Sequence, residues 1–198
     1  MTPRRLRAIL HVAMLSVWAM SMTAGQAASA NDIPALPVSY AANAVAQSGA
    51  AAGKPFGVTI YVTGWTTNAE IQELAATLKS KGPNGLASAM DDKKEVGRIA
   101  PIGSVGGDFR VARIRSANGG KYHIVLVTSR PISLAEQYAG TRSREYPFGI
   151  VVLDVDKNGA GTGILAPISK IKFNKQGELE VEHYGQKPFR LFNVRLNK

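Results

Sequence analysis

The sequence predicts an α+β fold: a mostly antiparallel, strongly curved β-sheet or partly open barrel of about eight or nine strands, with a helical pair inserted after the first strand. Two observations lead to this prediction. From Val96 onward, short segments rich in β-branched and aromatic residues alternate with glycine-containing turns. Before them, one stretch places apolar residues at the spacing of a helical face. We expect the helices to cover one side of the curved sheet.

The first thirty residues have the three regions of a secretory signal peptide. Three arginines stand within the first seven residues, a mostly apolar run follows from Ala8 to Met22, and the segment closes on Ala28-Ser29-Ala30. A membrane span needs about 20 apolar residues, more than this run provides. We therefore expect export to the periplasm or the extracellular space, and no membrane span once residues 1–30 are removed.

The composition narrows the classes of partner and site. The formal net charge is +10, and the signal segment carries three of these charges, which leaves +7 on residues 31–198. This excess favours an anionic ligand or a component of the cell envelope as partner. The chain has no basic run of about five or six residues, so we expect no binding of nucleic acid. It has no cysteine, which excludes disulfides, thiolate metal sites and cysteine nucleophiles.

The chain after the signal segment divides into a leader and one domain. Residues 31–54 are rich in alanine and have few large apolar side chains after Tyr40, so we interpret them as a flexible leader. Residues 55–198 have a length that suits a single domain with one core. The first strand of this domain is predicted over Phe56–Trp65, where β-branched and aromatic residues are dense.

The predicted helical pair follows this strand. Thr67 and Glu70 have the spacing of a capping box, in which each side chain satisfies an amide near the helix start. Gly82-Pro83 is predicted to end the first helix, and a shorter helix follows. The apolar residues of the two helices are Ile71, Leu74, Ala75 and Leu78, then Leu86, Ala89 and Met90.

Three hairpins are predicted in the rest of the chain. The dipeptide Asn-Gly, the strongest short hairpin signal, occurs at 118–119 and again at 158–159, each time between two strand-like segments. The third hairpin has its loop at 175–177, with Gly177 in a left-handed conformation. A last strand is predicted over Phe189–Leu196.

The third hairpin can be registered from its charges. In one register apolar residues face one another on one side and opposite charges face one another on the other side. A shift of one residue would mix the two kinds of partner, so this register is preferred. The predicted pairs are Phe173 with Leu179, Ile171 with Val181, Lys172 with Glu180, and Lys170 with Glu182.

Four stretches of the predicted domain carry a family resemblance. They are Gly64–Leu74, Val96–Ile99, Ile124–Ser133 and Tyr146–Phe148. Together they resemble a family of small exported bacterial proteins of unknown function, and the likeness extends over residues 55–198. The resemblance implies an exported single domain. The family carries no activity and no site residues that could be transferred to this chain.

One constellation suits a metal. Asp154, Asp156, Asn158 and Gly159 match the first, third, fifth and sixth positions of an EF-hand calcium loop. The match fails at the twelfth position, where Leu165 replaces the bidentate glutamate, and strands rather than helices flank the loop. Turn chemistry alone explains such a hairpin, and weak calcium binding is the alternative. The sequence contains no cofactor motif, so we expect no cofactor.

A cationic cluster is the candidate ligand site. Arg113 and Arg115 share one face of a predicted strand, and Arg142 and Arg144 precede a later strand. If these segments converge, their guanidinium groups can bind a carboxylate or phosphate in bidentate fashion. The alternative is a solvated strand surface whose charges discourage pairing between sheet edges.

These observations favour a non-enzymatic binding or interaction module whose ligand is unknown. The two histidines after residue 30, His123 and His183, are each alone in a predicted strand. The alternative is a hydrolase or other enzyme whose site is assembled from dispersed residues such as Glu145, Asp108 and His123. A smooth basic groove or an apolar calyx would favour binding, whereas a pocket that gathers two carboxylates, or a carboxylate and a histidine, would favour catalysis.

Overall fold

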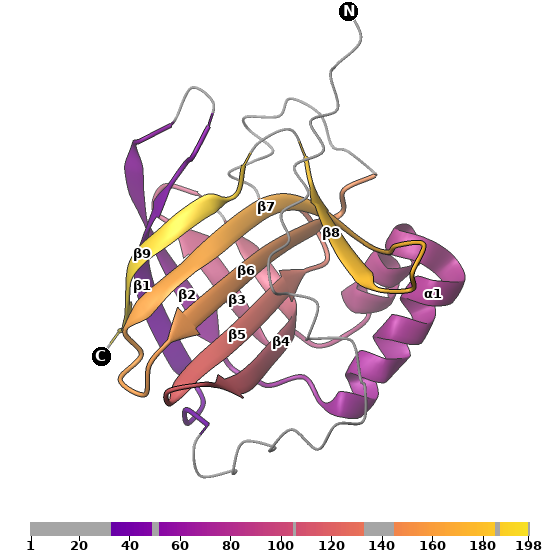
Figure 1. Cartoon of the computed structure of the whole chain (residues 1–198), viewed down its shortest axis with the longest axis horizontal. Helices are drawn as coiled ribbons and strands as arrows, with labels where there is room; N and C mark the ends of the chain where they lie inside the picture. The colour runs from indigo at the N-terminus through magenta and orange to yellow at the C-terminus, as the bar shows by residue number, and fades with distance from the viewer. Residues whose placement is uncertain (1–32, 49–51, 105, 133–144, 185–186, 198) are drawn as a thin grey trace, which may run out of the picture.

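The computed structural model describes residues 33–48, 52–104, 106–132, 145–184 and 187–197 (Figure 1). The predicted signal segment lies outside these residues. The elements are β1 (Val38–Val45), β2 (Pro55–Val62), α1 (Asn68–Asp91), β3 (Gly97–Pro101), β4 (Gly107–Ala117), β5 (Lys121–Thr128), β6 (Phe148–Val155), β7 (Gly161–Phe173), β8 (Leu179–His183) and β9 (Phe189–Leu196). Within the described ranges, no helix is both long enough and apolar enough to span a membrane.

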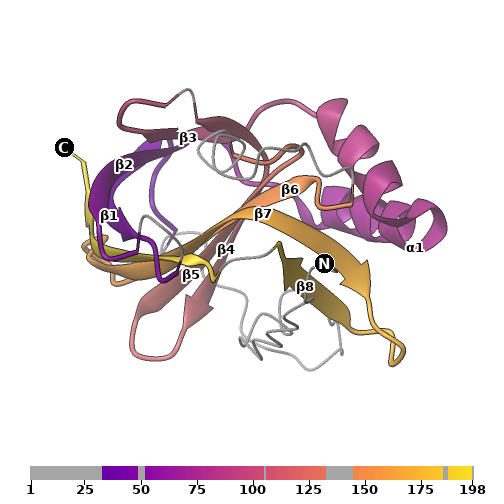
Figure 2. The same ribbon diagram turned by 90° about the horizontal axis from the view of Figure 1, so that it is seen from above.

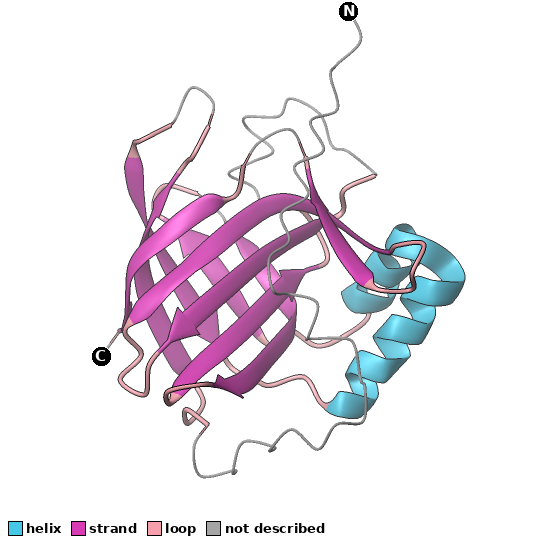
Figure 3. Ribbon diagram, in the orientation of Figure 1, coloured by secondary structure: helices cyan, strands magenta, loops and turns pink. Residues whose placement is uncertain are grey.

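The strands form a closed antiparallel barrel rather than the partly open one that the sequence predicts (Figure 3). The strand order is β6-β5-β4-β3-β2-β1-β9-β7-β8, and β6 also pairs with β7. This additional pairing joins the two ends of the sheet, so eight strands close the barrel and β8 stays outside it. The long strand β7 serves both parts, because Gly161–Leu165 pairs with β9 and Ser169–Phe173 pairs with β8.

The strand β1 is the largest difference from the sequence-based prediction. It lies within the segment that we interpret from the sequence as a flexible leader, yet it pairs with β2 on one side and β9 on the other. Val38, Tyr40, Ala42 and Ala44 alternate inward and are buried. Alanine is depleted in strands, so the strand signal of this segment is weak. Inside a narrow barrel, however, small side chains leave room for large ones from other strands.

The barrel wall separates two hydrophobic cores. Inward-facing side chains, among them Tyr40, Phe109 and Leu153, fill the barrel. Outward-facing side chains of β4 to β7 pack instead against α1. Figure 2 shows α1 on the outer side of the wall, next to β6 and β7. The helix contributes Leu74, Leu78, Leu86 and Met90 to this outer core, and each such burial stabilises the fold by about 1.5–3 kcal/mol.

The helix α1 begins with the predicted capping box. The Thr67 amide donates to Glu70 Oε2 at 2.7 Å, and the Glu70 amide donates to Thr67 Oγ1 at 3.3 Å. The predicted break at Gly82-Pro83 is present: α1 consists of two helical segments on either side of a non-helical kink at Gly82, and the second segment ends at Asp91. Gly82 has φ 68° and ψ −170°, a conformation open almost only to glycine. The kink separates the two helical segments of α1.

The predicted hairpins are confirmed. The Asn-Gly turns join β4 to β5 and β6 to β7, and all four predicted pairs of the β7–β8 hairpin are present. Gly177 has the expected positive φ of 79°. Ile171 and Val181 face the outer core beside α1. On the other side, Lys172 Nζ is 2.5 Å from Glu182 Oε1 and 3.6 Å from Glu180 Oε2, so its nearer partner is diagonal rather than directly opposite.

Candidate ligand-binding site

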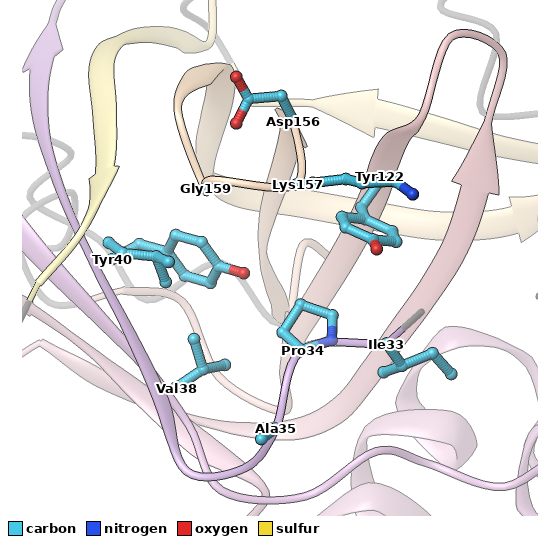
Figure 4. A pocket seen from close by; sticks show the side chains of 10 residues that line it. Ile33, Pro34, Ala35, Val38, Tyr40, Tyr122, Asp156, Lys157 and Gly159 are labelled. Atoms are coloured by element: carbon cyan, nitrogen blue, oxygen red, sulfur yellow. The ribbon is translucent and has the colours of Figure 1, made fainter. Parts of the chain in front are cut away.

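A cavity of about 250 Å³ lies at one end of the barrel, and we call it the barrel-mouth cavity. Five parts of the chain meet there: the segment before β1, β1 itself, the start of β5, the β6–β7 turn and the end of β9 (Figure 4). The lining residues are Ile33, Pro34, Ala35, Val38, Tyr40, Tyr122, Asp156, Lys157, Gly159 and Leu196.

Tyr40 brings an unpaired hydroxyl group to this cavity. It occupies an inward position of β1, opposite Ile60 of β2 and Leu196 of β9. Its side chain is 0 % exposed, and its hydroxyl has no hydrogen-bond partner among the described residues. Burial, and secondarily the neighbouring Tyr122, raises the pKa of Tyr40 to about 12. The phenol is therefore protonated at neutral pH and carries an O–H donor.

Tyr122 faces Tyr40 across the cavity. It lies at the start of β5 opposite Val155 of β6, and its side chain is buried. Figure 4 shows the Tyr40 hydroxyl group pointing toward Tyr122, and the Tyr122 hydroxyl group pointing toward the segment that carries Ile33 and Pro34. Together with Val38 these rings make the cavity wall mainly apolar, and the two hydroxyl groups are its polar points.

The β6–β7 turn supplies the remaining polar side of the cavity. Asp156 Oδ1 accepts hydrogen bonds from the amides of Asn158 and Ala160 at 2.8 and 3.0 Å, which fixes the turn. Gly159 has φ 77°, and a Cβ added there would come within 2.4 Å of Leu196 Cγ. Glycine is thus needed for the close approach of this turn to β9. Asp156 and Lys157 place one negative and one positive side chain at the cavity.

The candidate calcium ligands have other partners in the structure. Asp154 lies on the exposed outer face of β6, where its carboxylate is 2.7 Å from His123 Nδ1. Asp156 lines the cavity and is bonded to backbone amides, and Asn158 is exposed in the turn. Across the described part of the chain, no three His, Cys, Asp or Glu residues group together in a way that could hold a metal ion. The two hydrogen bonds of Asp156 are those of a tight turn, and calcium binding by this hairpin stays a prediction.

The candidate arginine cluster falls only partly within the described residues. Arg113 and Arg115 share the outer face of β4, as predicted, because Ala112 and Ile114 between and beside them pack into the barrel. Burial lowers the pKa of both guanidinium groups, and the pKa of Arg113 is lowered further by Arg115. Arg142 and Arg144 lie outside the described residues, so the structure leaves the predicted convergence as a prediction.

Arg113 already has a structural role. Its Nη1 donates to the Thr66 carbonyl at 2.8 Å, and its Nη2 donates to Asn68 Oδ1 at 2.6 Å. These bonds tie the start of α1 to the barrel wall. Both terminal nitrogens of this guanidinium group are therefore engaged by the protein itself, whereas its Nε is buried without a partner among the described residues.

The dispersed residues of the predicted enzyme site do not come together. His123 pairs with Arg115 near the β4–β5 turn, whereas Asp108 lies at the opposite end of β4. Glu145 precedes β6, whose first residues lie beside Thr128 at the far end of β5 from His123. The other histidine, His183, has its Nδ1 3.1 Å from Ser169 Oγ, and Ser169 is fully buried.

Sequence reasoning missed the barrel-mouth cavity, since Tyr40 stood in the presumed leader. The alternation from Val38 to Ala46, with each second residue apolar, was the available signal. The Ser169–His183 pair could have been found by extending the predicted β7–β8 register by one pair. Comparisons with protein families, curated proteins and solved structures returned no match for this chain.

Proposed function

We propose that this chain is a binding module that takes one small molecule into the barrel-mouth cavity. The observation that carries the proposal is the Tyr40 hydroxyl, which is buried beside the cavity without a hydrogen-bond partner among the described residues. Buried polar groups in native proteins are nearly always hydrogen-bonded, because leaving one unpaired costs about 1–3 kcal/mol. A ligand in the cavity supplies the missing partner.

The character of the cavity supports binding rather than catalysis. Small-molecule sites are typically concave and apolar with a few polar groups that orient the ligand, which is the composition of this wall. A closed barrel of eight strands has an interior that can hold one small ligand. The alternative, an enzyme built from Glu145, Asp108 and His123, needs residues that lie toward opposite ends of the β4–β5 hairpin.

A titration followed by NMR tests the proposed function. The probes are small ring compounds with different polar substituents, and the readout is the amide shifts of Tyr40, Tyr122 and Leu196. The Ala35→Trp variant places a large side chain at an exposed position that lines the cavity, and Ala52→Trp is the matched control at an exposed alanine outside it. We expect saturable shifts in the wild type and the control that are lost in Ala35→Trp. If no probe saturates the wild type, or if Ala35→Trp binds equally well, the cavity is not a binding site.

We also propose that the protein acts outside the cytoplasm after removal of residues 1–30. The support is the sequence pattern of a basic start, a short apolar run and a small-residue end. The expected product begins at Asn31, and mass spectrometry of the periplasmic and culture fractions identifies it. Recovery of an intact, membrane-embedded chain that begins at Met1 would contradict this proposal.

A further inference from the structure

We infer that the ligand of the barrel-mouth cavity is an uncharged ring compound whose carbonyl or ether oxygen accepts a hydrogen bond from the Tyr40 hydroxyl. This inference rests on the proposed function and adds to it the chemical class of the ligand. It is argued from the size of the cavity, the donor in its wall and the charges beside it.

The size of the cavity sets the size of the ligand. An apolar cavity of about 150 Å³ holds a molecule of the size of benzene. The barrel-mouth cavity, at about 250 Å³, therefore has room for one six-membered ring with a short substituent. A long chain or a fused ring system would have to extend into solvent.

The wall selects a ring that bears an acceptor. Tyr40 lines the cavity, and its protonated hydroxyl has no hydrogen-bond acceptor among the described residues. Tyr122 presents a second aromatic ring from the opposite side (Figure 4). Aromatic side chains pack well against planar rings, through the attraction of their faces and edges. A ring with one oxygen acceptor uses both features.

The charges beside the cavity favour an uncharged ligand. Asp156 and Lys157 are the two charged residues that line the cavity, and their opposite charges leave its lining without a net charge that would attract an ion. An ion of either sign would also lose hydration on entering a cavity whose wall includes Val38, Leu196 and two aromatic rings. A neutral oxygen avoids this cost and still pairs with the hydroxyl of Tyr40.

Two probes of nearly the same shape test this inference. Acetophenone carries a carbonyl oxygen, and isopropylbenzene has a methyl group in its place. The measured quantity is the ratio of the two dissociation constants, obtained by NMR titration for the wild type and for Tyr40→Phe. We expect the preference for acetophenone to fall about twofold to tenfold in Tyr40→Phe, because a neutral hydrogen bond contributes that much to an equilibrium. Tyr61→Phe, which removes a partly exposed phenol from β2, should leave the ratio unchanged.

The possible results separate this inference from the proposed function. If both probes bind the wild type and Tyr40→Phe leaves the ratio unchanged, the cavity binds ligands but Tyr40 does not select an acceptor, and the inference fails alone. If neither probe binds, the inference and the proposed function fail together. Unfolding of the free protein gives a second check, because removing an unpaired hydroxyl should not lower stability. A clear loss of stability in Tyr40→Phe would show that the hydroxyl already has a partner, and would also overturn the inference.

Discussion

At the scale of single residues, several polar side chains hold the fold together by bonding one segment to another. Thr66 is an example, since its amide donates to the Ala112 carbonyl at 2.8 Å and its Oγ1 accepts from the Ala112 amide at 2.9 Å. The loop before α1 thereby continues the hydrogen bonding of β4 beyond the short strand β3. Arg113 strengthens the same junction.

Replacing Thr67 tests the start of α1. Thr67→Ala should lower the free energy of unfolding by about 1 kcal/mol, because the Glu70 amide loses its side-chain acceptor. The amide of Thr67 also donates to the Glu70 carboxylate, a hydrogen bond that lowers the pKa of this carboxyl. Thr77→Ala is the control at an exposed position of the same helix, and there we expect no loss. Equal denaturation midpoints for Thr67→Ala and the wild type would mean that the cap contributes nothing.

His183 predicts a dependence of stability on pH. Burial lowers the pKa of His183 below its ordinary value of 6.5, so the folded protein binds fewer protons than the unfolded chain as the pH falls below that value. The stability that the neutral His183 side chain contributes is fully present above pH 6.5, and it is lost as the pH falls toward the lowered pKa. His183→Gln should therefore lose less stability than the wild type between pH 7.5 and pH 5.5, as measured by urea denaturation. If the free energies of unfolding of the two proteins changed equally with pH, the lowered pKa of His183 would be contradicted.

At the scale of elements, the β7–β8 hairpin shows how much a charge pattern determines. Its register follows from the two faces of the strands, one apolar and one charged, and the structure has that register. The apolar face covers the outer core beside α1, not the barrel interior. The pattern identified the buried face, but it could not identify what the face packs against.

Two lysine substitutions test the faces of β8. Val181→Lys places a charge against the outer core, whereas Glu180→Lys changes a partly exposed position beside Lys172. Burying an unpaired charge is far more costly than losing an exposed ion pair, which contributes about 0–1 kcal/mol. We expect Val181→Lys to lower the denaturation midpoint much more than Glu180→Lys. The opposite order would mean that the two faces are exchanged.

At the scale of the whole molecule, barrel closure depends on β1. This strand fills the place between β2 and β9, two strands that are distant in sequence. Without it both neighbours have open edges, and the inward side chains of β2, such as Val58 and Ile60, lose part of their cover. The strand Val38–Val45, which lies in the predicted leader, is therefore an integral part of the fold.

Two truncated chains test the role of β1. A chain that begins at Asn31 retains the strand and should unfold in one cooperative transition. A chain that begins at Gln47 lacks it, and we expect aggregation or no cooperative transition, because the barrel cannot close. Circular dichroism and size-exclusion chromatography compare the two. If the shorter chain folded with equal stability, residues 31–46 would be a dispensable leader after all.

The sequence by itself determined the local structure of this protein. The capping box, the two Asn-Gly hairpins, the last strand and the β7–β8 register were all predictable, because each depends on residues a few positions apart. The separation of apolar from charged residues also predicted which faces are buried. The break at Gly82-Pro83 was predictable in the same way, and Leu86 and Met90 of the segment after it pack into the outer core.

Only the tertiary structure decided the closure of the barrel, the identity of β1 and the position of the cavity. The β6–β7 and β1–β9 pairings form together with the packing of a shared interior, and no pattern within one strand reports its distant partner. Alanine has little intrinsic preference for the extended conformation. An alanine-rich strand therefore forms only where neighbouring strands pair with it and pack around it. Tyr40 and Tyr122 are 82 residues apart in sequence, and they face one cavity because closure of the barrel brings β1 and β5 to the same mouth.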